Sequence, residues 1–105
     1  MRPSCLMCVL KHLGQASVLL DEAKLGYPEH RWLAVGHLAE AESESLSDYP
    51  VLAQSIRETR KIVMDGGDMS LISLIHGAEG LLTQIPIDDL KPPQAHLDEW
   101  ERARR

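Results

Sequence analysis

Apolar residues recur three or four positions apart over most of the chain, which is the spacing of one face of an α-helix. The clearest series runs through residues 5–25 and consists of Val9, Leu13, Ala16, Leu20 and Ala23. Charged residues fall outside this series, as expected on the solvent side of an amphipathic helix. We predict a helix here, capped by Ser4 at its start and ended by Gly26-Tyr27-Pro28.

Three further helices are predicted by the same pattern. The second covers about 30–46, because Pro28 suits its first turn and Pro50 lies beyond its end. The third covers about 50–64, and the fourth, about 69–84, is the most apolar. Small residues on the second helix favour a close antiparallel hairpin with the first. The expected fold class is therefore all-α, a small bundle of four main helices.

The C-terminal part is predicted to be an appendage of the same domain. Three prolines occur between residues 86 and 93 and remove the backbone donors that a helix needs. A short helix over about 94–104 carries Leu97 and Trp100 as its large apolar side chains, so it would be marginal alone. The expected organisation is a helical core (1–85), a proline-rich linker (86–93) and a docking helix (94–105). Helix 69–84 or the docking helix would then contact a protein partner or a second copy of the chain.

Composition and charge narrow the class of protein further. Hydrophobic residues make up 44% and aromatic residues 4%, with no phenylalanine, a composition that suits packed helices better than a β-sandwich. The net charge of −5 opposes broad contact with a phosphate backbone, so nucleic acid is not an expected partner. No apolar run approaches the roughly 20 residues that span a bilayer, and the N-terminus lacks the pattern of a signal peptide. We therefore expect no membrane association and predict a cytoplasmic protein.

Both cysteines lie in one short segment, Cys5-Leu6-Met7-Cys8, which is followed by His12. On a helix, positions i, i+3 and i+7 share a face, so the two thiols and the imidazole would point the same way. Thiolate and imidazole are ligands that suit zinc, and a structural zinc site needs a fourth ligand. The candidates for it are Glu44, His37, His76 and His96.

The fourth ligand depends on how the first two helices are aligned. In a hairpin that turns near Tyr27, Glu44 would stand opposite His12. His37 would then lie about two turns away from His12. Two other interpretations of the cysteines remain open, namely inert packing as small buried side chains and a redox-active pair of thiols.

A second candidate site lies where the second predicted helix begins. Its residues are Tyr27, His30, Arg31 and Trp32. The helix start offers unpaired N–H groups, the guanidinium offers a planar fork, and the aromatic rings offer stacking faces. This combination would suit a small anionic, nucleotide-like molecule, and the protein would then sequester or sense that ligand.

A third hypothesis uses the acidic run of the second predicted helix. Glu40 and Glu44 lie one turn apart and could bind a metal together with a histidine, as in a metal-dependent hydrolase of the all-α type. Such a site needs a second pair of carboxylates, which the sequence does not supply at a suitable spacing. We therefore favour a small non-catalytic binding or adaptor module, in which zinc held by Cys5, Cys8 and His12 fixes the first helix.

Overall fold

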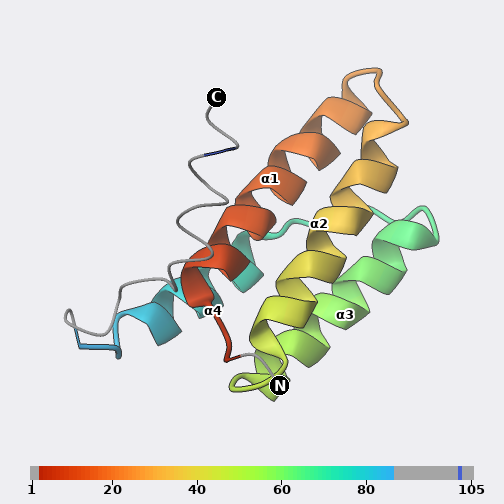
Figure 1. Cartoon of the computed structure of the whole chain (residues 1–105). Helices are drawn as coiled ribbons and strands as arrows, with labels where there is room; N and C mark the ends of the chain where they lie inside the picture. Colours follow the sequence, from red (N-terminus) through yellow and green to blue (C-terminus); the bar gives the residue numbers. More distant parts are fainter. Residues whose placement is uncertain (1–2, 87–101, 103–105) are drawn as a thin grey trace.

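The computed structural model describes residues 3–86 and residue 102, and over these residues the chain forms four α-helices and no strand (Figure 1). The helices are α1 (Leu6–Lys24), α2 (His30–Ser45), α3 (Pro50–Met64) and α4 (Ile72–Leu82). The predicted all-α fold is confirmed, although α4 is shorter than the predicted helix 69–84. The predicted linker (86–93) and docking helix (94–105) lie outside the described residues, apart from Pro86 and Arg102.

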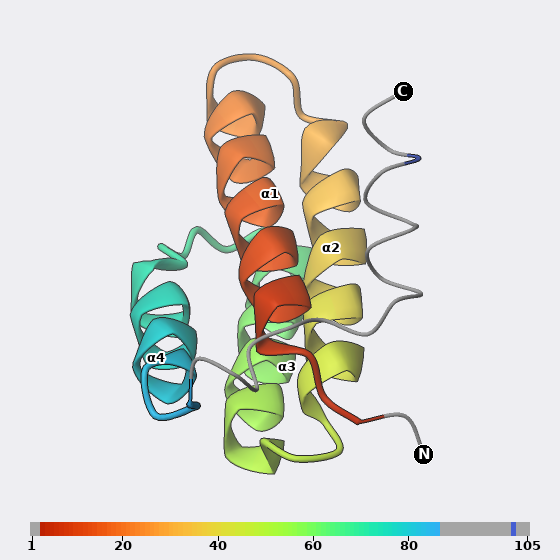
Figure 2. The ribbon, with the colours of Figure 1, turned by 60° about the vertical axis from the view of Figure 1, so that its left-hand side comes forward.

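An antiparallel hairpin of α1 and α2 forms the part of the molecule against which the other helices pack (Figures 1 and 2). Ala34 and Ala41 of α2 are completely buried, and their small side chains let the backbones of α1 and α2 approach closely. α3 packs against α2, and α4 packs against α1. Aliphatic side chains from all four helices and from the segment before α4 fill the space between them: Val9, Leu13, Ala16, Leu20, Leu38, Ile56, Val63, Leu71 and Ala78.

The start of α1 is fastened to the end of α2 and the turn that follows it. Cys5, and not Ser4, caps α1, because the Cys5 sulfur accepts a hydrogen bond from the backbone N–H of Cys8 at 3.3 Å. The prediction of a Ser4 cap is wrong because the Ser4 hydroxyl accepts a hydrogen bond from the Asp48 N–H at 2.9 Å. In return, the Ser4 N–H donates to the Asp48 carboxylate at 2.9 Å. The Cys5 N–H also donates to the Glu44 carbonyl at 3.0 Å, so backbone and side-chain bonds together fix this junction.

The connection between α3 and α4 is closed by two glycines and one arginine. Gly66 has a φ of 90°, in the left-handed region that favours glycine, and the Gly67 N–H donates to the Ile62 carbonyl at 2.9 Å. One nitrogen of Arg31, at the start of α2, donates to the carbonyls of Val63 and Gly67, both at 3.0 Å. Arg31 therefore holds the end of α3 against the start of the hairpin.

Although α4 is the most apolar helix, it does not lie at the centre of the bundle. Ala78 is its one buried residue, and Ile72 is 58% exposed. Figure 2 shows α4 beside α1 at the edge of the molecule. None of the four described helices is both long and apolar enough to cross a membrane.

Replacing Arg31 with methionine tests whether its contacts hold α3 in place. Arg31→Met keeps much of the side-chain volume but leaves the carbonyls of Val63 and Gly67 without their charged donor. We expect the free energy of unfolding to fall by roughly 2 kcal/mol, the scale of hydrogen bonds to a charged group. Urea denaturation followed by circular dichroism measures the change. Arg57→Met, at an exposed position of α3, is the control and should have little effect, and equal losses in the two variants would refute the assignment.

Candidate metal centre

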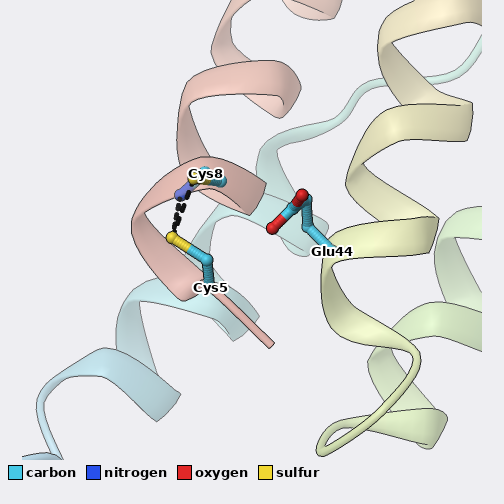
Figure 3. Close-up of side chains that lie close together, drawn as sticks. All are labelled: Cys5, Cys8 and Glu44. Atoms are coloured by element: carbon cyan, nitrogen blue, oxygen red, sulfur yellow. Dashed lines mark hydrogen bonds between the residues drawn. The ribbon is translucent and has the colours of Figure 1, made fainter. Parts of the chain in front are cut away.

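Three metal-ligating side chains meet where α1 begins and α2 ends (Figure 3). The sulfurs of Cys5 and Cys8 and a carboxylate oxygen of Glu44 all lie within 4.8 Å of one another. Cys5 is 6% exposed and Cys8 is 5% exposed, whereas Glu44 is half-buried. This is the one group of three or more potential ligands found within the described part of the chain.

Local helix geometry positions each member of this group. Cys5 is the cap of α1 and Cys8 lies in its first turn, so the two sulfurs are 2.8 Å apart and share a hydrogen bond. Glu44 lies in the last turn of α2, and its carbonyl accepts the hydrogen bond from the Cys5 N–H. The side chain of Glu44 consequently extends from α2 toward the two cysteines (Figure 3).

The surroundings of Cys8 keep its thiol protonated. The hydrogen bond with Cys5 raises the pKa of Cys8 far above its ordinary value, and burial and the negative charges of Cys5 and Glu44 raise it further. Lys11 acts in the opposite direction with a smaller effect. A buried thiol with a raised pKa is a poor nucleophile, so Cys8 would not be the attacking thiol of a redox-active pair. A bound divalent cation would reverse this balance, because cysteine binds metals as the thiolate.

The donor set suits zinc in chemical type, and its ligand atoms, within 4.8 Å of one another, would have to shift by about 1 Å to surround the ion. A tetrahedral zinc ion with bonds of about 2.3 Å to sulfur and about 2.0 Å to oxygen separates its ligand atoms by roughly 3.5–3.8 Å. The two sulfurs, now 2.8 Å apart, would have to separate by about 1 Å, which rotation of the cysteine side chains can provide. Two thiolates and one carboxylate leave one position of the tetrahedron for a further ligand.

His12 does not belong to this group, because its ring faces a second histidine. Its Nδ1 atom lies 2.9 Å from Nδ1 of His37 on α2, and the two ring centres are 5.2 Å apart. The prediction that His37 lies two turns from His12 is therefore wrong, and Glu44 stands opposite the cysteines instead. His76 is exposed on α4 and is not part of the group, and His96 lies outside the described residues.

The connection between α1 and α2 explains the altered alignment. The connection 25–29 folds back along α1, since the Tyr27 N–H donates to the Glu22 carbonyl at 3.2 Å. His30, the first residue of α2, contacts the Glu22 carboxylate at 2.5 Å. α2 therefore begins beside Glu22 rather than beyond the end of α1. Opposite His12, the expected Glu44 is replaced by His37, so α2 is displaced along α1 by about two turns at this level.

The residues of the predicted anion site are only partly brought together. The rings of Tyr27 and His30 stack, with centres 5.3 Å apart and an angle of 21° between their planes. His30 is engaged with Glu22, and Arg31 with the α3–α4 connection and with Asp68 at 3.8 Å. Trp32 is 61% exposed. The two basic side chains thus serve contacts within the fold.

The glutamates of the acidic run in α2 lie in different surroundings and do not meet at one site. Glu44 extends toward the cysteines, whereas Glu40 is exposed. Glu42 forms an ion pair with Arg60 of α3, with a nitrogen–oxygen distance of 2.9 Å. The pair of carboxylates considered for a hydrolase is therefore not directed at a common centre.

Comparisons with protein-family models, curated proteins and solved structures give no match for this chain. A function for it must therefore be inferred from the residues and their geometry.

The histidine pair makes the stability of the fold depend on pH. Burial lowers the pKa of both His12 and His37 below the ordinary value of 6.5, and the charge of His37 lowers that of His12 further, while Glu40 partly offsets both shifts. As pH falls below about 6.5 the unfolded chain binds these protons more readily than the folded chain does. We expect the free energy of unfolding to be greatest above this pH and to decrease below it, until the folded-state pKa values are passed.

Urea denaturation at several pH values between about 7.5 and 5 measures this loss. His37→Gln should reduce the dependence of the free energy of unfolding on pH. His76 is exposed on α4, so His76→Gln should leave this pH dependence unchanged. An identical pH dependence in the wild type and His37→Gln would show that the pair is not responsible.

Proposed function

We propose that Cys5, Cys8 and Glu44 bind a zinc ion that fastens the start of α1 to the end of α2 in a small, non-catalytic binding or adaptor module. One observation carries this proposal: three ligand atoms from opposite ends of the hairpin lie within 4.8 Å of one another, and both cysteines are buried. Thiolate sulfur favours zinc over magnesium or calcium, which prefer oxygen ligands.

The position of the site supports a structural rather than a catalytic metal. It lies at a junction that backbone bonds already hold, because the Cys5 N–H donates to the Glu44 carbonyl at 3.0 Å. A catalytic zinc needs an open position that faces a space for substrate. A groove of about 730 Å³ occurs in the molecule, but α3 and α4 line it and none of the three ligands does. Glu40 is exposed one turn away and does not supply a base at the site.

The fourth ligand of a structural site would be His12, since three protein ligands and a bound water are the arrangement of a catalytic zinc. His12 lies one helical turn beyond Cys8, on the same side of α1, and would have to turn away from His37 in order to reach the metal. A bound water would leave the histidine pair in place. Zinc affinity of the His12→Gln variant distinguishes the two, because loss of a ligand weakens binding and loss of an uninvolved histidine does not.

Zinc binding can be tested on the purified full chain with a matched pair of variants. Glu44→Gln removes the carboxylate ligand, and Glu40→Gln removes an exposed carboxylate one turn earlier on the same helix. We expect about one equivalent of zinc in the wild type and in Glu40→Gln. The affinity should be lower by about tenfold or more in Glu44→Gln, since a lost ligand costs more than about 1.4 kcal/mol. Competition with a chromophoric chelator measures these affinities.

Stability provides the second measurement. Zinc at about 100 times its dissociation constant should stabilise the wild type by about 2.7 kcal/mol and raise its melting temperature. Cys8→Ser should show no such shift, while its circular dichroism reports whether it still folds. Less than half an equivalent of zinc in the wild type, or equal affinities in the two glutamate variants, would refute the proposal.

A further inference from the structure

The facing sides of α3 and α4 enclose a groove of about 730 Å³ that the zinc proposal does not use. This volume is in the range of sites that bind ligands or peptide segments. Most of its surface is apolar, and its large apolar lining side chains include Tyr49, Val51, Leu52, Ile62, Met69, Leu74 and Leu81. Val51 is 81% exposed and Ile62 is 41% exposed, so this face of α3 is open. Burial of such a surface by a partner is favourable.

The lining residues have the spacing of a face that receives a helix. On α3 they recur from Val51 through Ser55 to Ile62, at intervals of three or four residues. On α4 they recur in the same way from Ser73 to Leu81. The groove therefore runs along most of α3, a length of about 17 Å at 1.5 Å per residue. A helix of about 12 residues has the same length, and helix-in-groove recognition uses anchors at these intervals.

Three small residues line the groove between its larger apolar side chains. Ser55 lines α3 near its middle, and Ser73 and Gly77 line α4. A Cβ atom added to Gly77 would meet nothing within 4 Å, so open space lies above it. Large apolar residues lie beyond these small ones, at Leu52 and Leu81. This arrangement allows close approach of a helix backbone and provides contacts for its apolar side chains.

The charges on the lining favour a basic partner. Asp48 and Glu58 are the charged residues that line the groove, and both are exposed carboxylates. The chain as a whole carries a net charge of −5. We propose that the groove between α3 and α4 binds an amphipathic helix of a partner protein, with an apolar stripe flanked by lysine or arginine residues. This proposal does not depend on the metal, because none of the three metal ligands lines the groove.

The probe for this surface is a synthetic amphipathic peptide. It has about 14 residues, leucines at intervals of three and four, flanking lysines and a fluorescein label. Fluorescence anisotropy with the full chain should show saturable binding. A peptide of the same composition in scrambled order, and one with glutamate in place of lysine, should each bind at least about tenfold more weakly. Equal binding of all three peptides would overturn the proposal.

Two glycines of α4 give a matched pair of variants. Gly77 lines the groove and Gly80 does not, and a Cβ atom at either position meets nothing within 4 Å. Leucine is a better helix former than glycine, so both Gly77→Leu and Gly80→Leu should fold at least as stably as the wild type. Gly77→Leu should weaken peptide binding by about tenfold or more, since its side chain occupies the groove, and Gly80→Leu by less than about twofold. Equal affinities in the two variants would overturn the proposal.

Two further experiments test the role of charge in peptide binding and whether the groove binds a second copy of the chain. Glu58→Lys should weaken binding of the lysine-flanked peptide by about tenfold and strengthen binding of the glutamate-flanked peptide. Glu79 is exposed on α4 outside the groove, so Glu79→Lys should change the binding of neither peptide. Analytical ultracentrifugation should give the same molecular mass for the wild type and Gly77→Leu. A wild-type dimer that Gly77→Leu converts to a monomer would overturn the proposal and assign the groove to a second copy of the chain.

Discussion

The hydrogen bond from the Cys5 N–H to the Glu44 carbonyl fixes the alignment on which the rest of the structure depends. Two antiparallel helices can slide along each other by a turn with little change in their apolar contacts, because each presents a repeating face. At one end, the connection 25–29 folds back on Glu22. At the other end, the Cys5 N–H donates to the Glu44 carbonyl, and Ser4 and Asp48 form two hydrogen bonds with each other. Together these contacts select one alignment of α1 and α2. In that alignment, two polar clusters lie between the helices: the group of Cys5, Cys8 and Glu44, and the pair of His12 and His37.

The same hairpin explains why α3 and α4 leave space between them. α3 packs along α2, and α4 packs along α1, so the two outer helices are positioned by different partners. Arg31 holds the connection that joins them through the carbonyls of Val63 and Gly67. Direct packing between α3 and α4 is consequently slight, and two large apolar side chains of α4, Leu74 and Leu81, remain half-buried along the groove. A helix that is apolar in sequence thus became a wall of a surface site instead of a core element.

The fold could be predicted from the sequence because periodicity, prolines and glycines mark the helices directly. Two residues of the candidate metal group could also be named, since Cys5 and Cys8 share a face whenever the segment is helical. His12 was predicted with them, but its ring faces His37 and it lies outside the group. The ligand that joins the two cysteines could not be assigned from the sequence. Whether Glu44, His37 or His76 lies near the cysteines depends on how the helices are aligned, and no local sequence pattern shows that alignment. The predicted alignment took the connection 25–29 to be a simple turn, whereas hydrogen bonds of Tyr27 and His30 to Glu22 draw α2 back along α1. Ser4 has the residue type of a helix cap, but its long-range bond to Asp48 overrides that local preference.

Asp48 lines the groove and also lies next to the metal junction. Its backbone and carboxylate are bonded to Ser4, the neighbour of the ligand Cys5, and it also lines the end of the groove between α3 and α4. A displacement of this one turn changes the metal junction and the groove together. Coupling between the two sites would require that binding at one of them moves this turn, and the coupling free energy would then be the same in both directions. If zinc binding displaced this turn, it would change the affinity of the groove for a helix, and a bound helix would change the affinity for zinc by the same factor.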